Sequence, residues 1–376
     1  MRFLRKNKSD RTIIVVSDLH LGAGPMIGGI RNYLEDFNSD QELVELLDYY
    51  SSGEYQNKKV EIIINGDFLD FLAVPFIEFF DDEFWSEEAA LAKFDLILKA
   101  HPEVINGLCL FVKKPEKKLT YIIGNHDAEL ILPKMQEKFL NLFDKEHRDS
   151  VEIIHEPQNA YRPHPEVLLK HGHEYEIAHL YNTEESIVKN ENGRRYFIPP
   201  WGSYYVTRVL NKFKEERHHV DSVKPIKKFI INGIIYDTLF TIRFLLATTY
   251  YFIMVRAILI FKEKKGFKKF LKKSFEELEL FNDYEELTQD VFIENPEVNI
   301  LIVGHTHEPM LRSNSEGKVF INTGTWTHMH HLDFGKNSDG ENLTYAQVDI
   351  DGAGKIVSTN LFCWRGRSNL PFYDFS

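Results

Sequence analysis

Five short polar motifs constrain this chain more than any other feature, because each directly follows a short apolar run. The motifs read DLH, GDFLD, GNHD, HGH and GHTH, and they occupy residues 18–20, 66–70, 124–127, 171–173 and 304–307. Short, β-branched apolar runs are typical of buried strands. Ligands of α/β sheets bind beyond the carboxyl ends of strands, so the five motifs are predicted to converge on one site.

The predicted strands alternate with predicted helices. Strands are expected at residues 12–16, 60–64, 119–123, 167–169 and 299–303, and further strands at 320–321, 344–350 and 355–362. Helical spacing of apolar residues occurs at residues 40–50, 86–100 and 132–143. This alternation predicts an α/β sheet covered on both faces. A hydrophobic content of 43% is enough for a sizeable core.

Composition excludes some classes of protein. The net charge of −12 argues against a general nucleic-acid binder, because contacts to phosphate dominate such binding. Cys109 and Cys363 match no zinc or redox spacing and are expected to be reduced thiols. The N-terminal residues lead into a short strand-like run instead of a secretory apolar stretch, so a cytoplasmic location is expected.

The motifs supply Asp, His and Asn side chains, which form a mixed oxygen and nitrogen donor set. Such a set suits Mn²⁺, our first expectation, or Fe²⁺ or Zn²⁺, whereas Mg²⁺ prefers oxygen alone. A carboxylate such as Asp67 can bridge two divalent cations roughly 3.5–4 Å apart. A pair of cations at that separation activates water and offsets charge on a leaving oxygen. The motifs therefore predict a two-metal hydrolase of phosphate esters.

The order of the motifs resembles that of the calcineurin-like metallophosphoesterases, whose pattern is D-x-H, G-D-x-x-D, G-N-H-[DE], H and G-H-x-H. The resemblance extends from Asp18 to His307. It implies an α/β fold, a β-sandwich flanked by helices in α-β-β-α layers. It also implies that His126 is the catalytic histidine, which stabilises or protonates the leaving group, with Asp127 as its orienting partner.

The same resemblance implies ligands for two cations, with one carboxylate shared between them. The ligands of the first cation would be Asp18, His20, Asp67 and His307. The ligands of the second cation would be Asp67, Asn125, His171 and His305.

Further polar residues near the motifs are candidates for contact with substrate or for support of the ligands. They are Asp70, His173, His179, Arg31 and Asn322. Each has an ordinary structural alternative, since Asp70 can cap a helix, a histidine can pack in a core, an arginine can lie on the surface and Asn322 can form a turn. The histidines at 328, 330 and 331 are expected in a surface loop near the mouth of the site instead of at a third metal.

A long insertion separates His171 from His305 and exceeds what a compact core needs. We expect a catalytic domain at residues 1–180 and 291–376 and a helical cap at 181–290. Within the cap, residues 229–261 predict one long or broken apolar helix, and residues 262–273 form a lysine-rich tail. The longest uncharged stretch, 244–255, is shorter than the roughly eighteen residues that a spanning helix requires.

An apolar helix beside lysines is the combination expected at an anionic membrane surface, here through residues 229–273. The alternative is that the apolar face packs on the catalytic domain or on a second subunit. The layout resembles the UDP-2,3-diacylglucosamine pyrophosphohydrolases, which share the opening S/A-D-L-H-L, here residues 17–21, and a helical lid for acyl chains. The chain departs from that branch in its longer insertion and at His126, where Arg is common.

Three functions remain as alternatives. The first is a hydrolase at the inner face of a membrane that cleaves a lipid-linked phosphoester or pyrophosphate. The second is a soluble phosphodiesterase or phosphatase acting on nucleotides or phosphoproteins, with the insertion as a cap or dimer interface. The third, a non-catalytic scaffold, is disfavoured because every ligand position and His126 are intact.

Overall fold

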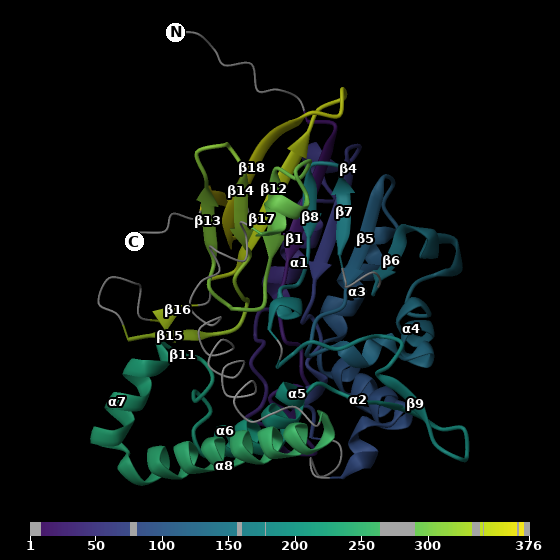
Figure 1. The fold of residues 1–376 in the computed structure, drawn as a ribbon. Helices are drawn as coiled ribbons and strands as arrows, with labels where there is room; N and C mark the ends of the chain where they lie inside the picture. The colour runs from purple at the N-terminus through teal and green to yellow at the C-terminus, as the bar shows by residue number, and fades with distance from the viewer. Residues whose placement is uncertain are drawn as a thin grey trace.

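Two β-sheets stacked face to face form the centre of the fold (Figure 1). The computed structural model describes residues 9–75, 81–155, 160–176, 178–263, 290–332, 339–340, 342–366 and 368–371. The first sheet has seven strands in the order β19-β18-β17-β1-β4-β5-β6. Its strands are β1 (Arg11–Val16), β4 (Lys59–Asn65), β5 (Lys117–Ile122), β6 (Val151–Ile154), β17 (Thr344–Ile350), β18 (Ile356–Arg365) and β19 (Ser368–Pro371).

The second sheet has five strands in the order β13-β14-β12-β8-β7. Its strands are β7 (Tyr161–His164), β8 (Val167–Leu169), β12 (Ile300–Val303), β13 (Met310–Ser313) and β14 (Val319–Asn322). Ile13 and Val15 of β1 pack with Ile300 and Ile302 of β12, so the core between the sheets is apolar. Successive strand residues point to opposite faces, which is why Ile14 joins a different core.

Helices cover the outer face of the seven-stranded sheet. They are α1 (Asp40–Tyr49), α2 (Glu87–Ala100), α3 (Pro102–Val112) and α4 (Pro133–Leu140). The apolar sides of these helices pack on Ile14 and Val16 of β1, and together they form the main core. Helix α2 begins after Ser86, whose hydroxyl accepts a hydrogen bond from the Ala89 amide at 3.1 Å. The predicted α/β class, with mixed sheets and helices, is confirmed; α3, β6, β7 and β13 were not predicted.

Shorter elements connect these layers. The short strands are β2 (Met26–Ile27), β3 (Ile30–Arg31), β9 (Ile187–Lys189), β10 (Arg195–Phe197), β11 (Val223–Lys224), β15 (Met329–His331) and β16 (Asp339–Gly340). The 3₁₀ helices are η1 (Gly53–Tyr55), η2 (Phe71–Ala73), η3 (Asp82–Trp85), η4 (Ala128–Ile131), η5 (Lys145–Ser150) and η6 (His173–Tyr175).

The insertion forms a helical layer at the end of the sandwich toward which β1 and β4 point (Figure 1). It contains α5 (Trp201–Tyr205), a π-helix η7 (Val206–Leu210), α6 (Asn211–Glu216), α7 (Ile226–Tyr236) and α8 (Thr238–Glu263). The predicted apolar helix at 229–261 is therefore broken, at Asp237. Residues 264–289, which include most of the predicted lysine-rich tail, lie outside the described residues. The boundary at 181 stays a prediction, although Phe197 packs in the main core.

Buried polar contacts attach the insertion to the rest of the molecule. The Asn211 amide donates to the Leu72 carbonyl at 2.8 Å. The buried Lys214 ammonium contacts the Asp36 carboxylate and lies 2.8 Å from the carboxylate of Asp221. Strand β11 pairs in parallel with β15, which follows the last motif in the chain. The insertion is thus joined to segments on both sides of it in the sequence.

A buried histidine connects α1 to the turn between α2 and α3. His101 Nδ1 lies 2.8 Å from the Asp40 carboxylate, and its Nε2 lies 3.6 Å from Glu35. Burial by itself lowers the pKa of His101, but the hydrogen bond to Asp40 and the charges of Asp40 and Glu35 outweigh it and raise the pKa to about 9. The ordinary value is 6.5.

We predict a pH-dependent loss of stability from this contact. Because the folded pKa of His101 exceeds the unfolded one, its contribution is complete below pH 6.5 and disappears as the pH rises through 9. The shift corresponds to about 3 kcal/mol at most. Urea unfolding of the wild type and of His101→Gln should differ most at pH 6 and little at pH 10. An equal difference at both pH values would contradict the assignment.

Candidate metal centre

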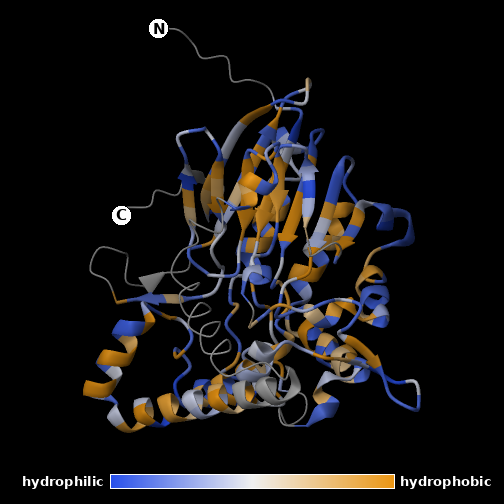
Figure 2. Ribbon diagram, in the orientation of Figure 1, coloured by the Kyte–Doolittle hydropathy of each residue, from blue (hydrophilic) through white to orange (hydrophobic). Residues whose placement is uncertain are grey.

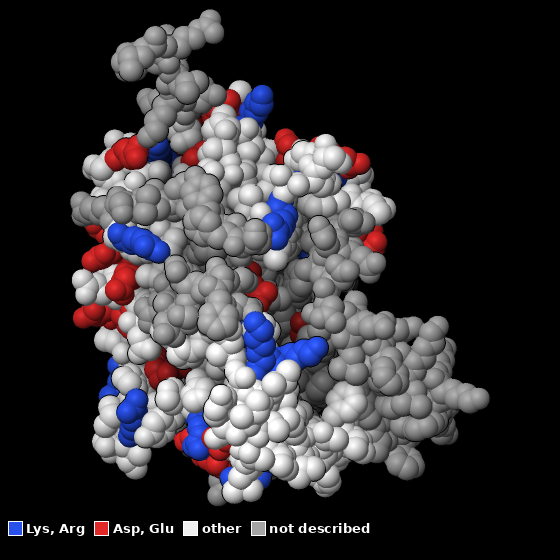
Figure 3. Space-filling view, turned by 90° about the vertical axis from the view of Figure 1, so that its left-hand side faces the viewer, with Lys and Arg blue, Asp and Glu red and all other residues white. Residues whose placement is uncertain are grey.

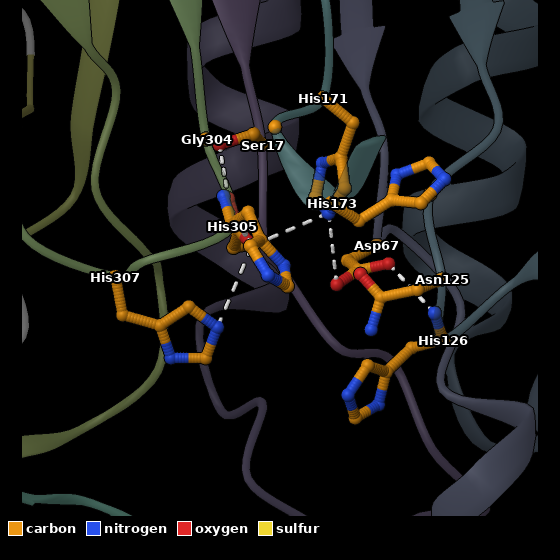
Figure 4. A network of polar contacts seen from close by, with 12 residues as sticks. Ser17, Asp67, Asn125, His126, His171, His173, Gly304, His305 and His307 are labelled. Carbon is orange, nitrogen blue, oxygen red and sulfur yellow. Dashed lines mark hydrogen bonds and ion pairs between the residues drawn. The ribbon is translucent and has the colours of Figure 1, made fainter. Parts of the chain in front are cut away.

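The five predicted motifs converge on one buried site (Figure 4). They follow the ends of β1, β4, β5, β8 and β12. The ligand atoms form overlapping groups, within each of which all atoms lie within 4.8 Å of one another. The groups are Asp18, His20 and His307; His20, Asp67 and His126; and Asp67, His171 and His305. Asp67 belongs to two of them, as a bridging carboxylate requires.

The backbone at these positions is left-handed. Among the described residues, six residues other than glycine have a positive φ, and five of them are predicted ligands. These five are Asp18 (53°), His20 (56°), Asp67 (53°), His305 (70°) and His307 (62°). Side chains with a Cβ disfavour this conformation, which costs about 1–3 kcal/mol per residue and clusters at functional sites. The fold therefore retains strain where it turns these side chains inward.

Two glycines let the strand ends approach one another closely. A Cβ at Gly124 would collide with the carboxylate of Asp67, and one at Gly304 would collide with the carboxylate of Asp18. Substitution at either position would displace a predicted ligand, so the glycines in the GNHD and GHTH motifs are explained by space at the centre.

The first group directs nitrogen and oxygen atoms at a common point. His20 Nε2 lies 3.0 Å from His307 Nε2, which lies 3.4 Å from Asp18 Oδ1. The other ring nitrogen of His20 lies 3.1 Å from Asp70 Oδ2. A carboxylate behind a histidine fixes the ring and leaves Nε2 available to a cation.

The second group contains buried atoms whose bonding capacity the protein leaves unused. His171 Nε2 lies 3.1 Å from Asp67 Oδ2 but has no partner in hydrogen-bond geometry among the described residues, and neither has Asn125 Oδ1. The other nitrogen of His171 contacts the Asn65 carbonyl at 2.7 Å. Buried polar atoms without partners are rare in proteins, and a cation would satisfy both. The donor set therefore fits two divalent metal ions.

Electrostatics at the centre favours cations. Burial lowers the pKa of a histidine, but at His171 the charges of Asp67 and Asp18 outweigh burial and raise the pKa to about 10. At His126 the charges of Asp70 and Asp67 likewise outweigh burial and raise the pKa to about 9. A metal ligand must be a neutral imidazole, so metal binding at His171 releases a proton and weakens as the pH falls.

The residue that orients His126 is Asp70, which corrects the prediction for Asp127. Asp70 Oδ1 lies 3.0 Å from His126 Nδ1, and its Oδ2 contacts His20. The same carboxylate caps η2 by accepting a hydrogen bond from the Ala73 amide at 3.0 Å. The Asp127 carboxylate instead accepts hydrogen bonds within the loops, from the Gly124 amide (2.6 Å), the Phe68 amide (2.9 Å) and the Tyr121 hydroxyl (2.6 Å).

The other candidates differ in their distance from the ligands. His173 is buried beside His171 and stacks on Tyr181 with ring centroids 5.3 Å apart. Asn322 is buried and donates to the Gly304 carbonyl at 2.9 Å, so it supports the GHTH loop. Arg31 is exposed on β3 with its guanidinium over the Tyr33 ring, away from any ligand contact described in the structure.

Sequence reasoning missed Glu176 and left the role of His179 open. These two residues and His305 form a further group whose ligand atoms lie within 4.8 Å of one another. Glu176 lies three residues after the HGH motif, directly after η6 ends at Tyr175. Its only signal in the sequence is a carboxylate three residues before a histidine, which is too common to predict a role.

The site agrees with the comparison with known proteins. The family model of the calcineurin-like phosphoesterases matches residues 11–309, which include every predicted ligand. The chain belongs to the calcineurin-like phosphoesterases. This phosphoesterase is therefore a metal-dependent hydrolase, and its His and Asp groups are consistent with two divalent cations. No curated protein matches its sequence.

Some solved structures are similar to this phosphoesterase, at low sequence identity. A dimetal phosphatase from Danio rerio is 12% identical, with 95% of this chain and 100% of that chain covered and a TM-score of 0.37. A predicted phosphoesterase from Streptococcus pneumoniae is 11% identical, with 96% of each chain covered and a TM-score of 0.30. Vacuolar protein sorting 29 from Cryptosporidium parvum is 12% identical, with 96% of each chain covered and a TM-score of 0.31.

We predict that Asp67→Asn weakens the binding of both cations, because Asp67 belongs to two ligand groups. Metal content after dialysis, measured by mass spectrometry of the elements, should fall from two cations per chain to fewer than one. Asp82→Asn is the matched control, since its side chain is 93% exposed and lies outside the centre. Loss of only one cation in Asp67→Asn would show that this carboxylate does not bridge.

Proposed function

We propose that this metal-dependent hydrolase cleaves a lipid-linked phosphoester or pyrophosphate while bound to an anionic membrane at its cytoplasmic face. The observation that carries the proposal is the exposed apolar surface of α7 and α8, on the helical layer beside the metal centre. The resemblance to the UDP-2,3-diacylglucosamine pyrophosphohydrolases motivates the class of substrate. Mn²⁺ is the proposed resident cation, because the donors combine imidazole nitrogens with carboxylate oxygens.

The proposed chemistry assigns a proton to His126. Two cations, when bound, would activate a water molecule and offset charge on the phosphate. Asp70 Oδ1 lies 3.0 Å from His126 Nδ1, and the charges of Asp70 and Asp67 outweigh burial and raise the pKa of the ring. The proposed acid is the protonated imidazole, whose Nδ1–H donates to Asp70. The Nε2 proton is then available to the leaving oxygen.

Helix α8 is apolar on both of its sides. Its inner side packs on the other helices of the insertion through Phe240, Phe244 and Tyr251. Its outer side exposes large apolar residues, which include Leu239 (73%), Leu246 (65%), Tyr250 (71%) and Ile253 (60%). A helix that is apolar all round is stable only when both sides are covered, so the outer side needs an apolar partner.

Helix α7 continues the exposed apolar surface. Ile226, Ile231, Ile235 and Tyr236 are exposed on it by 49–85%. Figure 2 shows apolar residues along α7 and the first part of α8. Figure 3 shows a broad uncharged surface over α7 with Lys and Arg side chains at its upper edge. An apolar surface bordered by cations matches the interface of an anionic bilayer.

Two charged residues of the apolar stretch, Arg243 and Asp237, are paired inside the insertion. The two terminal guanidinium nitrogens of Arg243, Nη2 and Nη1, donate to the Glu216 carboxylate at 2.9 and 3.1 Å. Arg217 Nε donates to Asp237 at 2.9 Å. These pairs reduce the free energy needed to move α7 and α8 against lipid.

The packing of α8 favours a position in the plane of the membrane. Residues 238–255 form an 18-residue stretch with a mean hydropathy of 1.5, long and apolar enough to span a bilayer. However, residues between Phe240 and Val255 of α8 pack in one cluster with Val209, Phe213 and Tyr205. A helix held along the surface of a folded domain lies on a membrane instead of crossing it.

We predict that the protein co-sediments with vesicles of phosphatidylglycerol and phosphatidylcholine at low salt. The triple substitution Leu239→Ser, Leu246→Ser and Ile253→Ser should abolish this binding. Each of these side chains is at least 60% exposed, and its burial in lipid is worth about 1.5 kcal/mol or more, roughly tenfold in affinity.

The matched control is Ile293→Ser, an equally exposed apolar residue outside α7 and α8. It should leave vesicle binding unchanged. If the wild type does not bind vesicles but sediments as a dimer that the triple variant dissociates, the apolar surface is a subunit interface. The membrane proposal would then be rejected in favour of a soluble phosphodiesterase or phosphatase.

We predict that His126→Gln lowers kcat by about 10²–10⁴-fold for bis(p-nitrophenyl) phosphate, the range for loss of general acid catalysis. Metal content should remain at two cations per chain. This second measurement is necessary because His126 lies within ligand distance of His20 and Asp67. Loss of a cation in His126→Gln would make His126 a ligand.

A further inference from the structure

A carboxylate that the motifs do not contain lies directly behind one of the predicted ligands. Glu176 Oε2 is 3.1 Å from His305 Nε2 and 3.6 Å from His179 Nε2. The backbone of Glu176 is fixed as well, since its amide donates to the His173 carbonyl at 3.0 Å and its carbonyl accepts from His179 at 2.9 Å. The carboxylate is therefore held in place next to the GHTH loop.

Two of the other predicted histidine ligands, His20 and His171, show how such a contact orients a ring. His20 turns Nδ1 to the Asp70 carboxylate, and His171 turns Nδ1 to the Asn65 carbonyl. In both rings the remaining nitrogen, Nε2, faces another predicted ligand, at 3.0 Å from His307 and at 3.1 Å from Asp67. One nitrogen of each ring thus contacts an oxygen acceptor, and the other faces the centre.

In His305 the two ring nitrogens have the opposite roles: Nε2, and not Nδ1, contacts the oxygen acceptor. Its Nε2 faces Glu176, so Nδ1 is the nitrogen left for a cation. Its backbone amide donates to the Asp18 carboxylate at 2.9 Å, which fixes the peptide while Glu176 fixes the ring. The two carboxylates together determine where Nδ1 points.

A third cation bound by Glu176, His179 and His305 is the competing interpretation of this group. It would require Nε2 of His305 to bind one cation while Nδ1 binds another. A ring that binds through both nitrogens has lost both N–H protons and is an imidazolate, whereas a neutral imidazole keeps one N–H as a donor. A carboxylate that accepts this N–H is the simpler arrangement and the usual partner of a metal-bound histidine.

We propose that Glu176 is a positioning residue that accepts the Nε2–H hydrogen bond of His305 and thereby directs Nδ1 to the second cation. The proposal rests on the two-cation centre and is independent of the membrane surface. The negative charge of Glu176 also makes His305 a stronger ligand, and loss of such a partner lowers metal affinity by about 10–100-fold.

The test is a calorimetric titration of the metal-free protein with Mn²⁺, which gives both the number of sites and their affinities. Glu176→Ala should keep two sites and weaken one of them by about 10–100-fold. Glu176→Gln retains an oxygen acceptor and should recover part of that loss. Glu184→Gln, an exposed carboxylate on the same loop, is the matched control and should bind as the wild type does.

Distinct outcomes would overturn the proposal. A third site in the wild type that disappears in both Glu176 variants would show that Glu176 is a direct ligand. Two unchanged affinities in Glu176→Ala would show that Glu176 has no role in metal binding. Fewer than two sites in the wild type would reject the two-cation centre itself, a failure separate from that of Glu176.

Discussion

The structure depends on forcing five side chains inward from the ends of strands. A strand that simply continued would point these residues alternately to the two faces of its sheet. The left-handed backbone at Asp18, His20, Asp67, His305 and His307 redirects them to one point instead. The sandwich is rigid enough to maintain these conformations because both faces of β1 are buried, one between the sheets and one against α1–α4. The free energy of cation binding at the centre would offset part of the free energy of this backbone strain.

Asp70 connects the metal ligands to the proposed proton donor. One of its oxygens contacts His20 and the other contacts His126, and the second also caps a helical turn. A substitution at Asp70 would therefore disturb metal binding, proton transfer and a loop at once. A substitution at Glu176 is easier to interpret, because its carboxylate faces a single predicted ligand, His305, and one neighbouring histidine, His179.

The sequence was sufficient for the parts of the fold that repeat a simple pattern. Apolar β-branched runs such as TIIVV determine buried strands, and polar residues directly after them determine the site. Helix α3 was missed because it begins at Pro102, only two residues after α2 ends, and no loop signal separates them. Asp127 was assigned to His126 from the resemblance of the GNHD motif to the family pattern, whereas the contact is made by Asp70 from another strand end. The sequence left open whether the apolar side of α8 is exposed or packs on the protein, and the structure shows that it has apolar residues on both its packed and its exposed side.

The attachment of the insertion has a geometric consequence for what the centre can reach. The helical layer is attached to the rest of the molecule by Asn211, by Lys214 and by the pairing of β11 with β15, and these contacts oppose a hinge motion of the layer. If the apolar surface of α7 and α8 binds a bilayer as proposed, the helical layer would hold the two cations at a fixed distance from the acyl chains. In the proposed membrane-bound state, the distance of the phosphorus from the acyl chains would therefore help to select the substrate, in addition to chemical recognition of the headgroup.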